Sequence, residues 1–149
     1  MKQREILRIL DANFNRCREG LRVCEEIARF VMQDKSLTAG LKRTRHAVSD
    51  CLQTLPVSLG KLMASRDTLS DVGKNPSPLE NKRKDALALF AANLERVKES
   101  LRVLEESSKL LDAALPAVFK KLRFKAYAIE KKALPKLETL RHHGPGHRR

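Results

Sequence analysis

Apolar side chains recur at spacings of three and four residues along most of the chain, a pattern that predicts amphipathic helices. The first helix is expected from about Lys2 to Met32, with Gly20 lowering its helix propensity by about 1 kcal/mol relative to alanine. The second should start at an N-cap near Ser36 and stop before Pro56, since proline cannot continue the hydrogen bonding of a helix. The chain therefore begins with a helical hairpin.

Two more helices are expected in the second half. The start of the third is marked by an N-cap, a proline in the first turn and a capping-box glutamate, at Ser77, Pro78 and Glu80. This helix should continue to about Leu111. The fourth should begin near 115–116 and run to about Leu134, where Pro135 ends or kinks it.

The two halves of the chain repeat one another. Residues 12–26 and 92–106 agree at nine of fifteen positions, and polar residues agree as faithfully as apolar ones. A second match, between 34–45 and 112–123, follows once two residues are dropped. The repeating unit is a helical hairpin that cannot bury its apolar face alone. Two such hairpins should pack about a pseudo-two-fold axis as an all-α four-helix bundle.

The composition agrees with this fold class. A chain of 149 residues can bury one core, and the abundance of Leu, Ala, Glu, Lys and Arg with 4% aromatic residues favours helices over sheets. We expect a single domain at 1–141, with repeat copies at about 5–55 and 79–134. A disordered basic and His-rich tail should follow at 142–149.

The charge of the chain points to an anionic partner. The formal net charge is +13, and residues 120–149 alone hold ten Lys or Arg and only two acids. A balance this basic favours binding of a nucleotide, a phosphorylated metabolite or a nucleic acid.

The repeated polar residues are the first candidates for that binding. On a helical wheel Asn13 and Arg16 fall inside the apolar arc, whereas Arg22 and Glu25 point outward. An arginine inside an apolar arc needs a partner, because an unpaired buried charge costs several kcal/mol. Arg16 and its counterpart Arg96 therefore either bridge to glutamates in a structural network or bind a phosphate. Arg22 and Glu25 are interpreted as solvated partners within one helix.

The connector at about 56–78 is the second candidate region. It lacks an apolar period, apart from a short helix at 59–63, and contains the segment RDTLSDVGK at 66–74. Its two aspartates could hold Mg²⁺ while neighbouring cations and backbone N–H groups contact phosphates. The alternative is a surface turn rich in Asp and Gly. A loop of this length inside a compact bundle is often a binding loop.

Several common chemistries are excluded. The chain has no GxxxxGK[ST], GxGxxG, HExxH or GxSxG motif and no Cys/His cluster with zinc spacing. A di-iron bundle needs Glu-x-x-His on two helices, and no histidine lies on the first helix of either copy. The three cysteines, Cys17, Cys24 and Cys51, are interpreted as small buried apolar residues of a reducing compartment.

Taken in order, four segments resemble the small all-helical hydroxymethylpyrimidine-phosphate kinases, which occur alone or fused to the N-terminus of thiamine-phosphate synthase. The segments are ILRILDANFNRCREGLRVCEEIARFVMQD, LKRTRH, RDTLSDVG and AANLERVKESLRVLEESSKL, and the resemblance covers about residues 5–131. It implies transfer of the γ-phosphoryl group of ATP, with Mg²⁺, to 4-amino-5-hydroxymethyl-2-methylpyrimidine phosphate in thiamine biosynthesis. The stretch KNPSP after the loop departs from the family pattern.

Site roles follow from this resemblance together with the residues. Catalysis of phosphoryl transfer rests on positioning and charge neutralisation, so arginines and aspartates are the expected groups. The catalytic candidates are Arg16, Arg66, Asp67, Asp71 and Arg96, with Asp67 and Asp71 as the metal ligands. The candidates for binding substrate or nucleotide are Asn13, Glu19, Arg45, His46, Gly73, Asn93, Glu99 and Arg123.

Two readings from other classes stay open: a basic helical nucleic-acid-binding protein and a non-catalytic regulatory bundle. The low aromatic content and the lack of a recognition motif speak against nucleic acid without excluding it. No apolar run approaches the length of a membrane span, and the N-terminus lacks the form of a signal peptide. We expect a soluble cytoplasmic enzyme whose partners are small molecules, and a homo-oligomer is left open.

Overall fold

The computed structural model describes residues 1–75 and 82–143. Helices are the only regular elements in these ranges: α1 at Gln3–Glu26, a π-helical turn η1 at Ile27–Val31, α2 at Lys35–Gln53, α3 at Leu59–Ala64, α4 at Ala86–Ser108 and α5 at Leu115–His142. The all-α expectation is confirmed, and so is the short helix in the connector. None of the helices in these ranges is long and apolar enough to cross a membrane.

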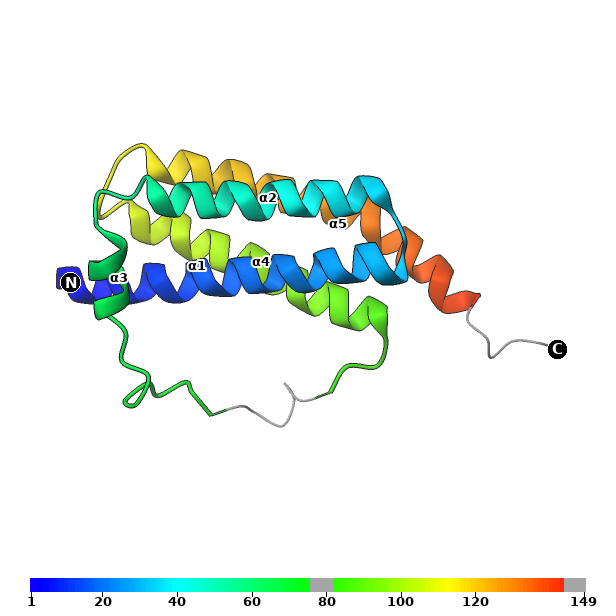
Figure 1. Ribbon diagram of the computed structural model, residues 1–149, viewed down its shortest axis with the longest axis horizontal. Helices are drawn as coiled ribbons and strands as arrows, with labels where there is room; N and C mark the ends of the chain where they lie inside the picture. Colours follow the sequence, from blue (N-terminus) through cyan, green and yellow to red (C-terminus); the bar gives the residue numbers. More distant parts are fainter. Residues whose placement is uncertain (76–81, 144–149) are drawn as a thin grey trace.

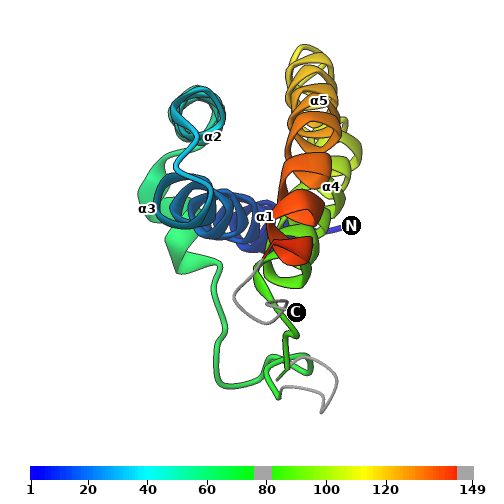
Figure 2. The ribbon, with the colours of Figure 1, turned by 90° about the vertical axis from the view of Figure 1, so that its right-hand side faces the viewer.

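The helices form two hairpins, α1 with α2 and α4 with α5, as expected (Figure 1). The hairpins meet chiefly through α1 and α4, which cross one another, and α2 touches α5 on one side of that pair. The connector after α3 leaves on the other side, away from α2 and α5 (Figures 1 and 2). One face of the α1–α4 pair is thus covered by helices and the other lies beneath the connector.

The core is built from the apolar stripes that the helical period predicts. On α1 the fully buried side chains follow spacings of three and four residues: Leu10, Phe14, Cys17, Leu21 and Cys24. The ring of Phe14 meets that of Phe119 on α5 edge to face, with centroids 5.6 Å apart. All three cysteines are buried and unpaired, in agreement with their interpretation as core residues.

Gly20 marks the crossing of α1 and α4. A β-carbon at this position would lie 2.8 Å from the backbone oxygen of Asn93 and 2.9 Å from a methyl group of Val97. Glycine therefore allows the two central helices to approach closely, which explains a residue that lowers helix propensity within α1.

Three helix boundaries differ from the sequence prediction. The N-cap of α2 is Asp34, whose side chain accepts a hydrogen bond from the backbone N–H of Leu37, so Ser36 already lies inside the helix. The capping box expected at Ser77, Pro78 and Glu80 lies outside the described residues. A helix running on from it is wrong, however, because residues 82–84 are not helical and Asp85 caps α4 instead.

The expected end at Pro135 is also wrong, since α5 continues to His142. Pro135 is exposed, so water can reach the carbonyl whose helical bond it removes. Beyond it Leu137 is buried, and two ion pairs hold the last turns: Lys136 with Asp34 and Arg141 with Asp85. Tertiary contacts thus outweigh the local break, and His142 belongs to α5 rather than to a disordered tail. Residues 144–149 lie outside the described ranges.

Candidate functional site

Four connected hollows lie along the faces of α1 outside the core, and most of the predicted site residues line them. They differ in the element that faces α1: α4, the connector or α2. Neighbouring hollows share residues, so they form one continuous band of polar surface along the helix.

The crossing hollow lies between α1 and α4 and has a volume of about 380 Å³. It is lined by Asn13, Arg16, Arg96, Glu99, Ser100 and Val103. The guanidinium groups of Arg16 and Arg96 are exposed, and neither forms an ion pair or hydrogen bond with any residue that the structure describes. The expected structural network through these two arginines is therefore not formed. Two cations with free donors, one from each repeat, face a single hollow.

Asn13 is buried at the floor of this hollow, in agreement with its place in the apolar arc. Its Nδ2 donates to the backbone oxygen of Ile9 at 2.8 Å, and Asn93 makes the equivalent bond to Leu89 at 2.9 Å. Because one N–H of the amide is bound to the helix, the side-chain oxygen and the second N–H are left to face a ligand. Asn93 lies elsewhere, with its backbone oxygen against Gly20.

The bridging hollow, of about 340 Å³, connects the crossing hollow with the connector. It is lined by Glu5, Arg8, Ile9, Ala12, Asn13, Arg16 and Asp71. Arg8, Ala12 and Arg16 are four residues apart and so form one stripe along α1. Arg8 and Arg16 lie about 12 Å apart along the helix axis at a rise of about 1.5 Å per residue.

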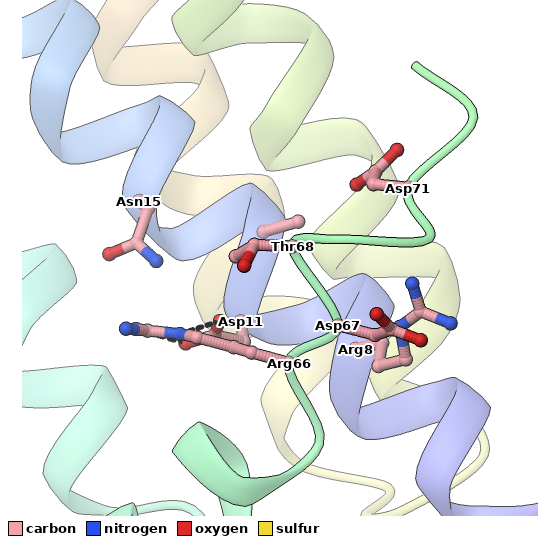
Figure 3. Close-up of a pocket in the computed structure, with 8 residues that line it drawn as sticks. Arg8, Asp11, Asn15, Arg66, Asp67, Thr68 and Asp71 are labelled. Atoms are coloured by element: carbon pink, nitrogen blue, oxygen red, sulfur yellow. Dashed lines mark hydrogen bonds and ion pairs between the residues drawn. The ribbon is translucent and has the colours of Figure 1, made fainter. Parts of the chain in front are cut away.

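The connector hollow, of about 300 Å³, lies between α1 and the segment that follows α3. It is lined by Arg8, Asp11, Ala12, Asn15, Arg66, Asp67, Thr68 and Asp71 (Figure 3). The side chain of Arg66 donates to both carboxylate oxygens of buried Asp11, at 2.5 and 2.8 Å. This hydrogen bonding raises the pKa of Arg66. Arg66 thus fastens the connector to α1 through its Nε and Nη2 atoms.

Each of the two connector aspartates accepts a backbone hydrogen bond through its Oδ1 atom. Oδ1 of Asp67 accepts from the backbone N–H of Ser70 at 3.0 Å, and Oδ1 of Asp71 accepts from that of Gly73 at 2.8 Å. The Ser70 hydrogen bond, helped by the charges of Arg8 and Arg4, lowers the pKa of Asp67. Figure 3 shows Asp67 beside Arg8 and Asp71 further along the connector. Gly73 serves the backbone of this turn and lines none of the four hollows.

Asp67 and Asp71 both line the connector hollow, and carboxylate oxygens are the donors that Mg²⁺ prefers. Among the described residues no three Asp, Glu, His or Cys side chains converge, so the protein alone offers no complete cage. Mg²⁺ is typically held by one or two carboxylates, substrate phosphates and water. The free oxygens of Asp67 and Asp71 would meet that need when a phosphate occupies the connector hollow.

The α1–α2 hollow is the largest of the four, at about 560 Å³. It is lined by Asn15, Arg18, Glu19, Arg22, Val23, Arg45 and Ser49. Arg45 donates from Nε to Glu25 at 2.8 Å, so its cation is largely used within the protein. Glu25 is buried, and the expectation that it points outward is wrong, because α2 covers that side of α1.

Two further candidates lie outside the band. Arg123 on α5 pairs with buried Glu105 at 3.0 Å, as Arg45 pairs with Glu25 in the first copy. The equivalent pairs tie each hairpin together, and a structural role accounts for Arg123. His46 is exposed on α2 and lines none of the four hollows.

Sequence reasoning missed Arg8, Asp11, Asn15 and Arg18. Asp11 is the partner of Arg66, yet its repeat counterpart is Ala91, so a search for repeated polar residues passes over it. Its burial could have been detected only by recognising that the connector returns to α1.

Comparison with known proteins identifies the class. Residues 8–132 match the ThiD2 family, and the chain belongs to this family. The chain is 46% identical to thiamine-phosphate synthase of Synechocystis sp. over an alignment of 126 residues. This alignment covers 84% of the chain and 35% of the relative. It is 41% identical over 128 residues to thiamine-phosphate synthase of Rhodopirellula baltica, covering 85% and 34%. The chain thus spans about a third of the length of these curated relatives. No solved structure matches it.

Proposed function

We propose that this protein is an ATP-dependent kinase of thiamine biosynthesis. It would transfer the γ-phosphoryl group of ATP to 4-amino-5-hydroxymethyl-2-methylpyrimidine phosphate and release ADP and the pyrimidine diphosphate. Membership of the ThiD2 family and the similarity to thiamine-phosphate synthases support a place in that pathway. The observation that carries the reaction type is the pair Arg16 and Arg96, which face one hollow without any partner in the described chain.

The acceptor phosphate would lie in the crossing hollow. Arginine presents a planar fork of donors that suits phosphate, and one guanidinium from each side can bind different oxygens. The buried side-chain oxygen of Asn13 and the carboxylate of Glu99 provide acceptors for the amino group of the pyrimidine. A substrate without the phosphate would gain no charge-assisted hydrogen bonds from the two arginines, so we expect selection for the monophosphate over the free alcohol.

The chemistry requires little more than charge neutralisation. An oxygen of the acceptor monophosphate attacks the γ-phosphorus, the bond from that phosphorus to the β–γ bridging oxygen breaks, and ADP departs. A phosphate monoester is already largely ionised at pH 7, so no general base is needed to create the nucleophile. The absence of His46 from the hollows is consistent with this. Arg8 and Arg16 flank the bridging hollow, where the repulsion between two phosphate groups must be overcome.

Asp67 and Asp71 are the residues that would hold Mg²⁺. When bound, the ion neutralises phosphate charge and orients the transferred group. Asp71 lines both the connector hollow and the bridging hollow, so it stands between the two phosphate positions. Arg66 acts here as a positioning residue, because its bond to Asp11 keeps both aspartates near α1.

The test is removal of the paired cations. Charge-assisted hydrogen bonds are worth about 1.5–3 kcal/mol, so Arg16→Gln and Arg96→Gln should each lower kcat/KM for the monophosphate about 10-fold to 100-fold. Arg43→Gln provides the control, since Arg43 is an exposed arginine of α2 outside the four hollows. Equal activity of all three variants, at equal urea midpoints, would refute the proposed acceptor site.

A further inference from the structure

The two copies of the repeat differ in the polar side chains that lie between their paired helices, which are α1 and α2 in the first copy and α4 and α5 in the second. With residues 12–26 matched to 92–106, and with the register of 34–45 against 112–123 continued along α2 and α5, each residue of the α1–α2 hollow has a counterpart on α4 or α5. In order, the counterparts of Asn15, Arg18, Arg22, Arg45 and Ser49 are Glu95, Lys98, Arg102, Arg123 and Tyr127. The same backbone arrangement therefore carries two different sets of side chains.

In the second copy these side chains form a cluster of ion pairs. The ammonium group of Lys98 lies 2.7 Å from Glu95 and 2.6 Å from Glu130, and Lys98 is buried. The ring of Tyr127 lies 5.2 Å from the same ammonium group and 5.9 Å from the guanidinium carbon of Arg123. The cations of this cluster, Lys98 and Arg123, are therefore already paired with carboxylates and covered by the tyrosine ring.

In the first copy the place is open. Ser49 replaces the tyrosine and Leu52 replaces Glu130, so neither an aromatic ring nor a second carboxylate closes the space. The hollow keeps about 560 Å³. Arg18 has no carboxylate partner among the described residues, and its Nη2 donates only to Asn15 at 3.2 Å. Three arginines line the hollow against one glutamate, Glu19.

The hollow also adjoins the proposed metal ligands. Asn15 lines both the α1–α2 hollow and the connector hollow, where Asp67 and Asp71 lie. A ligand with several phosphates in a row could therefore begin among Arg18, Arg22 and Arg45 and end beside the aspartates. The crossing hollow lies on the other side of α1 and would hold the acceptor.

We infer that the α1–α2 hollow is the subsite for the phosphate chain of the donor nucleotide, with Arg18 and Arg22 as its ligands. The inference rests on the proposed function for the identity of the nucleotide as a phosphoryl donor. Arg22 pairs with Glu25 at 3.4 Å and with Glu26 at 2.7 Å. The guanidinium of Arg22 and the carboxylate of Glu26 are both exposed, and an exposed pair contributes little, so a phosphate can compete for this guanidinium. Arg45 remains with Glu25 and supplies positive charge at the back of the hollow.

The repeat provides a matched control. Arg102 makes the same pairs as Arg22, with Glu105 at 3.5 Å and Glu106 at 3.3 Å. The two side chains are 53% and 57% exposed. Replacing either one removes the same structural interactions, so a ligand role is what distinguishes them.

The experiment is titration calorimetry of the full chain with a non-hydrolysable ATP analogue and Mg²⁺, without acceptor. We expect Arg22→Gln and Arg18→Gln each to raise Kd about 10-fold, while Arg102→Gln stays within about 2-fold of the wild type. Equal effects of Arg22→Gln and Arg102→Gln, or no analogue binding by the wild type, would overturn the inference. So would weaker binding of the pyrimidine monophosphate with unchanged binding of the analogue.

The same measurement separates this inference from the proposed function. If Arg22→Gln weakens analogue binding but the wild type fails to phosphorylate the pyrimidine monophosphate, the nucleotide subsite stands and the proposed acceptor falls. If turnover is normal and analogue binding is insensitive to Arg18 and Arg22, the proposed function stands and the subsite falls.

Discussion

The close approach of α1 and α4 at Gly20 can be tested with a single methyl group. In Gly20→Ala the new carbon would lie 2.8 Å from the backbone oxygen of Asn93 and 2.9 Å from a methyl group of fully buried Val97. Neither neighbour is the flexible end of a long side chain, so the two helices must move apart. Overpacking of this kind costs about 1–3 kcal/mol. The gain in helix propensity, about 1 kcal/mol, offsets part of that cost.

Gly40→Ala on α2 is the matched control. A β-carbon at Gly40 meets nothing closer than the end of the Arg43 side chain, at 3.9 Å. This variant gains the same propensity without the overlap and should be about 0.5–1 kcal/mol more stable than the wild type. Because propensity cancels between the two variants, their difference isolates the overlap, about 1–3 kcal/mol.

The assay is thermal unfolding of both variants followed by far-UV circular dichroism. For a chain of 149 residues a change of 1 kcal/mol shifts Tm by about 3 °C, so the variants should differ by about 3–9 °C. If Gly20→Ala raises stability as much as Gly40→Ala does, the helices do not approach as described. The crossing hollow between Arg16 and Arg96 would then lose its geometric basis.

Three other expectations follow from buried or engaged side chains. Burial raises the pKa of Cys17 and Cys24 to about 12 from an ordinary value of 9.0, so the unfolded chain ionises first as pH rises. The free energy of unfolding should therefore fall above pH 9, by about 1.4 kcal/mol per thiol at pH 10. If the variant with both cysteines replaced by alanine lost as much stability at pH 10 as the wild type, this reasoning would be wrong. Arg66→Ala leaves buried Asp11 unpaired, so the free energy of unfolding should fall by about 1–2 kcal/mol. Trypsin should also cleave the connector faster, and unaltered cleavage would count against the Arg66–Asp11 bond. Asp71→Asn should raise the Mg²⁺ concentration for half-maximal turnover about 10-fold, and an unchanged requirement would remove Asp71 from the proposed metal site.

The helices could be predicted because a 3.6-residue apolar period is a local property. Their pairing could be predicted because the two halves of the chain repeat one another. Gly20 was taken only as a weakness within α1, since its value lies in contact with Asn93 on another helix. Asp34 and Asp85 replaced the expected caps because several polar residues could start each helix, and packing selects among them. Pro135 does not end α5, because tertiary contacts of the residues beyond it stabilise the last turns of the helix. The pseudo-two-fold axis stays a prediction, although equivalent ion pairs recur in both copies.

The site was predicted in part for the same reason. A helical wheel treats a helix as if one neighbour covered one face, but α1 is covered by α2 on one side and crossed by α4 on the other. Glu25, expected outside, is therefore buried beneath α2. Arg16, expected inside, is exposed beneath the connector. Repetition of polar residues did identify Arg16 and Arg96, yet it also selected Arg123, whose repetition reflects a structural ion pair with Glu105.

The most direct test of the proposed kinase is ADP release by the purified protein in the presence of Mg²⁺ and ATP. It should be measured with the pyrimidine monophosphate, with the free hydroxymethylpyrimidine and with neither. We expect turnover with the monophosphate alone, because only that substrate carries the phosphate for Arg16 and Arg96. The diphosphate product should appear in equal amount. Folded protein that releases no ADP with the monophosphate, or that prefers the free alcohol, would contradict the proposed function.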